Sequence, residues 1–261
     1  SGWAERGRTH LIDGGRYTYK YDHPSRQYVE STRAHNTVEI DGRDFSRYNQ
    51  DAFGSAIVDG GESGGAFFVE AQLHRKRFFD THHRRILVYR PGLWLTVVDH
   101  LTSPEPHDFA QCFHFDPELE FQTTSGRGIA ADLPQTGAAL KVVSLAPLGA
   151  VTPQLIKGQT EPRLQGWTSL AANELIPNYA LELKTRGNDV LYVTLLALTD
   201  KGTTIQPGRT VLDDVTGNLQ VRWHIDGAEE GFDFQETQTG RTINLIQRTG
   251  TTAEKPGKRI R

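Results

Sequence analysis

The chain has 261 residues, of which 36% are hydrophobic, 23% are charged and 9% are aromatic. A chain of this length can bury a large core, and the composition is typical of a globular protein rather than a disordered one. The formal net charge of -3 does not suit general electrostatic attraction to nucleic acid or acidic membranes, so we expect neither as a partner. No apolar run approaches the length of about 18 residues that a membrane helix needs.

Short segments rich in β-branched and aromatic residues recur along the chain and predict strands. They lie at residues 37–40, 66–70, 85–89, 93–99, 140–145, 179–184, 190–198, 219–225 and 242–247. Arg90-Pro91-Gly92 predicts the turn of a hairpin from Arg84 to Leu101, whereas breaks are expected at 59–65, 103–107, 186–189, 201–209 and 213–218. No segment has the apolar period of a helix. We expect an all-β fold, a large antiparallel β-sandwich of the supersandwich kind, over residues 1–248, followed by a polar, flexible tail over 249–261.

Asp13 and His35 are the strongest candidates for a metal-binding site. A carboxylate and an imidazole are common zinc ligands, but a structural zinc site needs about four ligands, and spacing does not show whether these two meet. His10 is three residues before Asp13 and would lie on the opposite face of a strand. His35 and Asn36 interrupt a strand-like stretch, so the alternative is that they only satisfy hydrogen bonds where a strand begins.

Four tyrosines stand close together, at positions 17, 19, 21 and 28, among Arg16, Lys20 and Arg26. If the segment is a strand, alternation places Tyr17, Tyr19 and Tyr21 on one face, where they form an aromatic stripe suited to stacking on a sugar. Nearby cations would lower the pKa of a phenol from about 10 towards that of a useful base. The alternative is a half-exposed strand surface without a ligand.

Residues 74–90 hold six Arg or Lys, three His and a single acid, Asp80. Guanidinium groups bind carboxylate or sulfate through paired hydrogen bonds, so this run is either a dock for an acidic ligand or a solvated strand face.

Three further features have simpler interpretations. Gly61-Glu62-Ser63-Gly64-Gly65 matches G-x-S-x-G, but a strand follows it, so we expect a glycine turn rather than a nucleophile. Gly126-Arg127-Gly128 has no helix behind it and is expected to be a loop rather than a phosphate cradle. Cys112, the only cysteine, stands in an apolar run and is expected to pack in the core.

Five segments together resemble a known family. They are IDGGRYTY from Ile12, RQYVESTRAHNTVEIDG from Arg26, HHRRILVYRPGLWLTVVDHL from His82, GWTSLAANELIP from Gly166 and LYVTLLAL from Leu191. The chain resembles the C-terminal β-sandwich of heparinase II/III-like polysaccharide lyases. This resemblance implies an enzyme that cleaves a uronate-containing polysaccharide, such as heparan sulfate or alginate, by β-elimination.

The resemblance also implies that an N-terminal α/α toroid precedes the sandwich and that the active cleft lies between them. In relatives the toroid supplies an asparagine, a histidine and a tyrosine for catalysis. Asp13 and His35 look like two ligands of a zinc site whose further ligand comes from a segment upstream of IDGG. The chain has no methionine, even at position 1, so we expect a processed product or a fragment of a longer protein, periplasmic or secreted by resemblance.

β-Elimination needs the uronate carboxylate neutralised, a base near the proton to be removed and an acid for the leaving oxygen. By motif position, Tyr17 and Tyr28 are the candidates for catalysis, and Arg26, Arg33 and Asn36 are the candidates for binding an acidic polysaccharide. Since the toroid is expected outside this chain, catalysis by the chain alone is not expected. The alternative functions are a non-catalytic module that binds acidic glycans and a purely structural sandwich.

Overall fold

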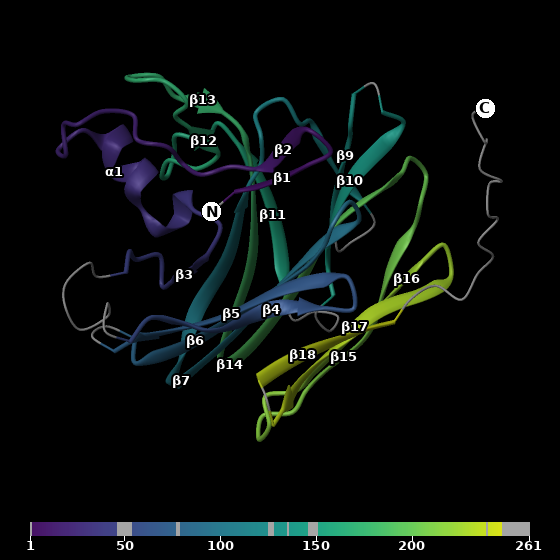
Figure 1. Ribbon diagram of the computed structural model, residues 1–261. Coiled ribbons are helices and arrows are strands. Elements are labelled where there is room, and N and C mark those ends of the chain that lie inside the picture. Colours follow the sequence, from purple (N-terminus) through teal and green to yellow (C-terminus); the bar gives the residue numbers. More distant parts are fainter. Residues whose placement is uncertain are drawn as a thin grey trace.

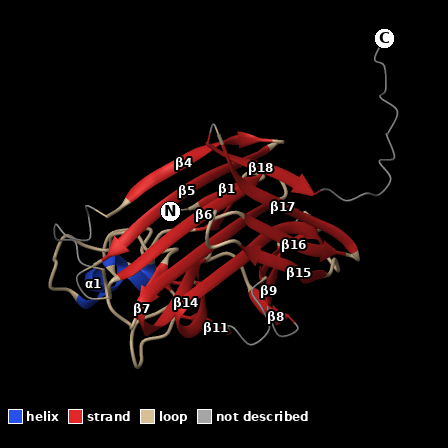
Figure 2. Cartoon of the chain, turned by 90° about the horizontal axis from the view of Figure 1, so that it is seen from below, coloured by secondary structure: helices blue, strands red, loops and turns tan. Residues whose placement is uncertain are grey.

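The computed structural model describes residues 2–45, 54–76, 79–124, 128–134, 136–145, 151–238 and 240–246. The predicted all-β fold is confirmed, because antiparallel strands make up most of this part of the chain (Figures 1 and 2). The tail expected over 249–261 lies outside the described residues, as do Gly126 and Arg127. No helix among the described residues is long and apolar enough to cross a membrane.

The large sheet has ten strands, eight of which follow one another in hydrogen-bonded order. In that order they are β4 (Ala56–Ser63), β5 (Ala66–Arg75), β6 (Thr81–Arg90), β7 (Trp94–His114), β14 (Tyr179–Asp200), β10 (Ala138–Ser144), β9 (Gly128–Asp132) and β8 (Phe121–Thr124). Two more strands extend it, since β3 (Val38–Ile40) pairs with β7 and β11 (Thr152–Lys157) pairs with β14. The predicted hairpin from Arg84 to Leu101 is confirmed as β6 and the first part of β7.

Strands β7 and β14 are much longer than the sequence predicted. They pair antiparallel from Trp94 opposite Ala197 to His114 opposite Ala180, with an irregularity in register between Gly187 and Asp189. The strands thus continue through the breaks expected at 103–107 and 186–189, but their pairing is interrupted there, because residues 103–106 have no register partner on β14. The side chains in these stretches are largely exposed, which explains a turn-like composition inside continuous strands.

Four strands form the second sheet, which packs against one face of the large sheet. They are β15 (Ile205–Leu212), β16 (Leu219–Ile225), β17 (Ala228–Thr237) and β18 (Gly240–Ile246). Apolar side chains alternate inward from both sheets, and Trp94 of β7 meets Trp223 of β16 edge to face, with ring centroids 5.1 Å apart. These rings and the aliphatic side chains around them form the apolar layer that holds the two sheets together.

The predicted glycine turn is confirmed at Gly64 and Gly65, whereas residues 59–63 of the expected break belong to β4. Gly64 and Gly65 have positive φ angles and connect β4 to β5, while Ser63 at the end of β4 donates its hydroxyl hydrogen to the Ile243 carbonyl at 2.8 Å. Cys112 is fully buried, as predicted, and burial raises the pKa of its thiol well above the usual value.

Smaller elements cover the end of the large sheet that carries the N-terminal part of the chain. They are β1 (Trp3–Glu5), β2 (Arg8–Leu11), α1 (Pro24–Glu30), the 3-10 helix η1 (Thr32–Ala34), β12 (Trp167–Thr168) and β13 (Ile176–Pro177). Both views show α1 far from the second sheet (Figures 1 and 2). Tyr28, Val29 and Ala34 form a small apolar cluster here.

The helix α1 was not predicted, and the strand expected through Tyr17, Tyr19 and Tyr21 is wrong. Pro24 occupies the first turn, and the His23 side chain accepts a hydrogen bond from the Ser25 backbone at 3.2 Å, as an N-cap does. Seven residues are too few to show an amphipathic period. Tyr17 adopts a φ of 63°, so the preceding segment is an irregular loop.

Candidate functional site

Asp13 and His35 meet in the structure. The Asp13 Oδ2 atom lies 3.0 Å from the His35 Nδ1 atom, and the two side chains are 47% and 31% exposed. The hydrogen bond with His35 holds the pKa of Asp13 well below its usual range, against the opposing effect of partial burial. A carboxylate and an imidazole thus stand side by side at an accessible surface.

The double glycine after Asp13 brings two backbone segments into direct contact. Gly15 has a φ of 80°, and a Cβ atom there would lie 2.0 Å from the carbonyl oxygen of Ser169. The Ser169 backbone donates to the Gly14 carbonyl at 3.0 Å, and the Thr168 hydroxyl donates to the Asp13 carbonyl at 3.1 Å. Glycine is needed at Gly15 because any side chain would separate the IDGG segment from the GWTS segment.

Asn36 fixes the segment that carries His35. Its side-chain nitrogen donates to the Ile12 carbonyl at 2.8 Å, and its oxygen accepts from the His114 backbone at 2.7 Å. Only 6% of Asn36 is exposed. These contacts favour the alternative interpretation of Asn36, a hydrogen-bonding role in the fold, over the predicted contact with substrate.

Tyr28 is buried in the apolar cluster of α1. A catalytic base must be accessible to the substrate, and Tyr28 is not. Its hydroxyl lies 3.0 Å from the Gln165 Oε1 atom and accepts a hydrogen bond from the Trp167 backbone at 3.2 Å. Burial raises the pKa of Tyr28 to about 12. The geometry therefore favours a structural role for Tyr28.

Tyr17 is the more accessible of the two tyrosines predicted to be catalytic. It is half-buried, and its ring packs against His23 with the ring centroids 4.9 Å apart. Its backbone carbonyl accepts a hydrogen bond from Asn173 at 2.7 Å, which ties the tyrosine loop to the segment after GWTS. Tyr17 thus retains the partial exposure that contact with a substrate requires.

Arg26 and Arg33 form internal ion pairs. Arg26 is 5% exposed, pairs with Glu30 of the same helix and donates to the Arg16 carbonyl at 2.9 Å. Arg33 donates to the buried Glu39 carboxylate at 2.7 Å. Neither guanidinium is open to a polysaccharide carboxylate in this arrangement, so both side chains are better explained as parts of the fold.

The basic run at 74–90 is not one continuous dock for anions. Arg84 pairs with Glu70 at 2.6 Å, while the guanidinium of Arg85 binds both oxygens of Asp99, at 2.6 and 2.8 Å. The carboxylates come from the neighbouring strands β5 and β7, so a count of charges along one segment misses them. The predicted hairpin does indicate the Arg85–Asp99 pair, because its register places these two residues opposite each other.

A groove of about 410 Å³ is lined by Thr37, which follows His35 by two residues, and by His83 and Arg85. The His83 Nε2 atom lies 2.6 Å from the fully buried Asp99 carboxylate. Burial lowers the pKa of His83, which favours the neutral imidazole. In the sequence His83 stands out only as one member of the basic run, and nothing local indicates its orientation by Asp99.

Comparisons with known proteins agree with this architecture. Residues 4–189 match the family model described as Heparinase II/III-like, C-terminal. The chain belongs to this family. A search of the curated proteins finds no match.

Solved structures of heparinases have the same fold as this heparinase II/III-like domain. The Heparinase III-BT4657 gene product is 14% identical, with a TM-score of 0.70 over 88% of this chain and 35% of that one. The heparan sulfate lyase HepC from Pedobacter heparinus is 13% identical, with a TM-score of 0.68 over 92% of this chain and 35% of that one. The heparinase II/III-like domain therefore spans about a third of the length of these relatives.

The donor atoms of the domain allow a test of the expected zinc site. Asp13 and His35 are suitable ligands and converge, but zinc sites use at least three protein ligands. In the described part of the chain, no group of three or more His, Cys, Asp or Glu side chains is arranged to hold a metal ion. The described residues alone therefore do not form a zinc site.

Proposed function

We propose that this domain is the C-terminal β-sandwich of a polysaccharide lyase that cleaves a uronate-containing polysaccharide, heparan sulfate-like or alginate-like, by β-elimination. The observation that carries the proposal is the convergence of Asp13 and His35 at an accessible surface, where three of the family-like segments meet. Family membership supports the reaction class. One structural neighbour is a heparan sulfate lyase, which supports the substrate class.

The Asp13–His35 pair suits proton transfer or metal binding. With a carboxylate at Nδ1, the imidazole is assigned the tautomer that carries its hydrogen on Nδ1. The lone pair on Nε2 is then able to accept a proton or bind a cation, and the ring is held in one orientation by Asp13. Tyr17, half-buried in the adjacent loop, is the tyrosine with the better access to a substrate.

We assign the remaining requirements of the reaction to parts of the lyase outside this sequence. Neutralising the uronate carboxylate and protonating the leaving oxygen need further positioned groups, which we assign to an N-terminal α/α toroid. In the same proposal, Asp13 and His35 provide two ligands of a zinc ion, and a segment before IDGG provides the rest. The lyase would act in the periplasm or outside the cell.

A second function, the binding of acidic glycans without cleavage, is favoured by a different observation. Tyr28, one of the two tyrosines predicted to be catalytic, is buried in internal contacts, which leaves only Tyr17 of that pair accessible. On this alternative, the glycan would contact exposed polar side chains of the groove that Thr37 lines, such as Gln72.

The experiment is an assay of the lyase that joins this domain to its toroid, on heparan sulfate and on alginate, by the absorbance of the unsaturated uronate product. We expect turnover, and a loss of at least about 10-fold in activity for His35→Ala, because this variant removes one of the two proposed zinc ligands in the domain. His100→Ala is the matched control, because His100 forms a similar pair with Asp189 at 2.8 Å elsewhere on the sheet.

Two results would count against the lyase proposal. One is the absence of turnover on any uronate polymer. The other is an equal loss of activity in the His35→Ala and His100→Ala variants. Saturable glycan binding without turnover would support the alternative function instead.

A further inference from the structure

The hairpin of β1 and β2 holds the backbone that leads into Asp13. The Asp116 backbone, just after β7, donates to the His10 carbonyl at 3.2 Å. Two residues further along, the Ile12 backbone donates to the His114 carbonyl at 2.9 Å. A two-stranded hairpin is at best marginally stable by itself, so its closed position depends on contacts with the rest of the domain.

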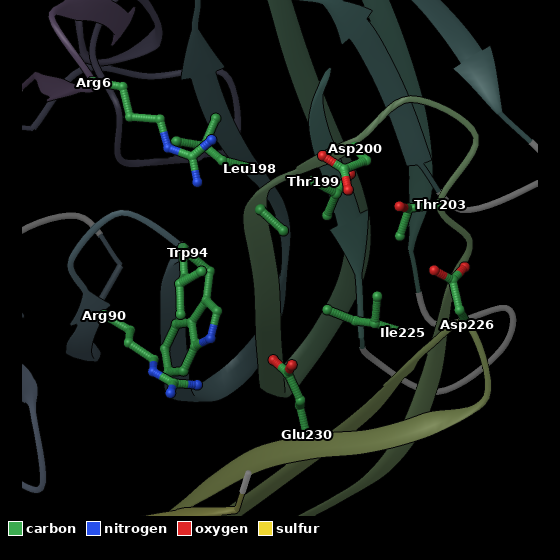
Figure 3. A pocket seen from close by; sticks show the side chains of 12 residues that line it. Arg6, Arg90, Trp94, Leu198, Thr199, Asp200, Thr203, Ile225, Asp226 and Glu230 are labelled. Atoms are coloured by element: carbon green, nitrogen blue, oxygen red, sulfur yellow. The ribbon is translucent and has the colours of Figure 1, made fainter. Parts of the chain in front are cut away.

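The turn of this hairpin is attached to the turn between β6 and β7. The Glu5 carboxylate accepts from the Tyr89 hydroxyl and, at 3.0 Å, from the Gly92 backbone. The Arg6 guanidinium donates to the Gly92 carbonyl at 2.7 Å. Figure 3 shows the Arg6 side chain reaching into the pocket that Trp94 also lines. The hydrogen bonds from Tyr89 and Gly92 lower the pKa of Glu5, so these contacts favour the ionised carboxylate.

Polar atoms without partners lie beneath the hairpin. His10 is fully buried and Trp3 is 8% exposed, and their ring centroids are 4.9 Å apart. Neither nitrogen of the His10 ring, nor the Trp3 indole nitrogen, forms a hydrogen bond of normal geometry with the described part of the chain. Burying unpaired polar groups costs free energy that is recovered when they reach water. The hairpin therefore has the features of an element that opens locally.

The buried imidazole makes this opening sensitive to pH. Burial lowers the pKa of His10 from its ordinary 6.5, so the closed hairpin favours the neutral ring. Of the charged groups that face His10, Arg8 adds to this effect, whereas Glu5, through its backbone and its charge, and Asp116 oppose it without overcoming it. The open hairpin therefore binds a proton more tightly than the closed one, and acid favours opening. Protonation of Glu5 at lower pH acts in the same direction, since its pKa is also lowered in the closed state.

We propose that the β1–β2 hairpin is an acid-sensitive latch on the segment that carries Asp13. At neutral pH the uncharged His10 ring packs against Trp3 and the hairpin stays closed. As the pH falls below about 6.5, the imidazole takes up a proton from water, and the hairpin opens into solvent while the two sheets stay folded. Asp13 then keeps its contact with Thr168 but loses the fixed backbone before it. The consequence for catalysis, a weakened Asp13–His35 pair in acid, rests on the proposed function.

Hydrogen exchange at the indole nitrogens tests this proposal on the whole domain. The chain has four tryptophans, and the variants Trp3→Phe and Trp94→Phe assign the two relevant signals in proton–nitrogen correlation spectra. The protection of each indole proton, corrected for the pH dependence of the chemical exchange rate, gives the population in which that ring is exposed. From about pH 7.5 to about pH 5, we expect the protection of Trp3 to fall about tenfold or more, because opening binds a proton. Trp94, in the core between the sheets, should keep its protection.

Two histidine variants identify the group that titrates. His10→Phe keeps an aromatic ring against Trp3 but binds no proton, so the protection of Trp3 should stay constant over this range of pH. His224→Phe is the matched control and should retain the fall, because the His224 side chain is 37% exposed on β16 and pairs with Glu229. Constant protection of Trp3 in the wild type, an equal fall in His10→Phe, or a parallel fall at Trp94 would overturn the proposal. The comparison of Trp3 with Trp94 in the wild type decides it even if His10→Phe does not fold. No substrate is used, so the lyase proposal does not depend on the outcome.

Discussion

Replacing Asp99 by asparagine is the most informative perturbation of the fold. Asp99 is fully buried in β7 and lies within hydrogen-bond distance of four nitrogen atoms. They belong to His83 at 2.6 Å, to Arg85 at 2.6 and 2.8 Å, and to Gln111 at 2.7 Å. Asn keeps the size of the side chain but removes its charge and turns one acceptor into a donor.

The size of the effect follows from what remains after the substitution. The Arg85 guanidinium would be left without its counter-ion, and breaking one side of a buried ion pair costs about 3–5 kcal/mol. Because 19% of the Arg85 side chain is exposed, water offsets part of this loss, and we expect the lower end of the range, about 3 kcal/mol.

Urea-induced unfolding of the purified domain measures this difference in the free energy of unfolding. The matched control is Asp132→Asn, which removes an exposed ion pair with Lys201 and should cost less than about 1 kcal/mol. If Asp99→Asn stays within about 1 kcal/mol of the wild type, or if the control costs as much, the ion pair does not stabilise the fold as argued.

Three further predictions concern the site region. Gly15→Ala should destabilise the domain more than Gly7→Ala in urea unfolding, because both glycines have positive φ angles, at a cost of about 1–2 kcal/mol, but only at position 15 would the added Cβ atom clash with Ser169. Equal losses would contradict the close approach. Tyr28→Phe should cost about 1–2 kcal/mol by the same measurement, since buried partners lose their hydrogen bond, and an unchanged stability would contradict the buried contacts. Burial lowers the pKa of His114 to about 4, below the ordinary 6.5, so the folded state binds fewer protons and stability should fall as the pH decreases from about 6.5 to 4. His114→Gln should flatten the dependence of the Tm on pH in this window, and an unchanged slope would refute the assignment.

The sequence was sufficient for the fold class because alternation and turn residues are local signals. The hairpin around Arg90-Pro91-Gly92 is present, and all nine predicted strand segments overlap strands of the structure. The errors occurred where tertiary context overrides a local signal. Polar stretches lie inside β7 and β14 where the register of the pair is irregular and the side chains are largely exposed, and α1 is stabilised by its buried face rather than by a long amphipathic period.

The site was predicted only in part. Asp13 and His35 were linked through family-like motifs, and the structure shows that they meet. Spacing alone does not reveal such a contact over 22 positions. The partners of Arg26 and Arg33 were close in sequence, at Glu30 and Glu39, yet motif position was read as a sign of substrate binding. A check for acids within one helical turn would have identified the pair at Arg26.

The buried cluster at Asp99 also connects the large sheet to the candidate site. Arg85, held by Asp99, donates through its remaining nitrogen to the Asn36 carbonyl at 2.6 Å, while the Asn36 side chain bonds to Ile12 and His114. His35 and Asp13 each adjoin one of these anchored residues along the chain. Loss of the Asp99 charge should therefore loosen the backbone that orients the Asp13–His35 pair as well as the sheet, which makes Asp99 a positioning residue in the proposed lyase although it lies in the core.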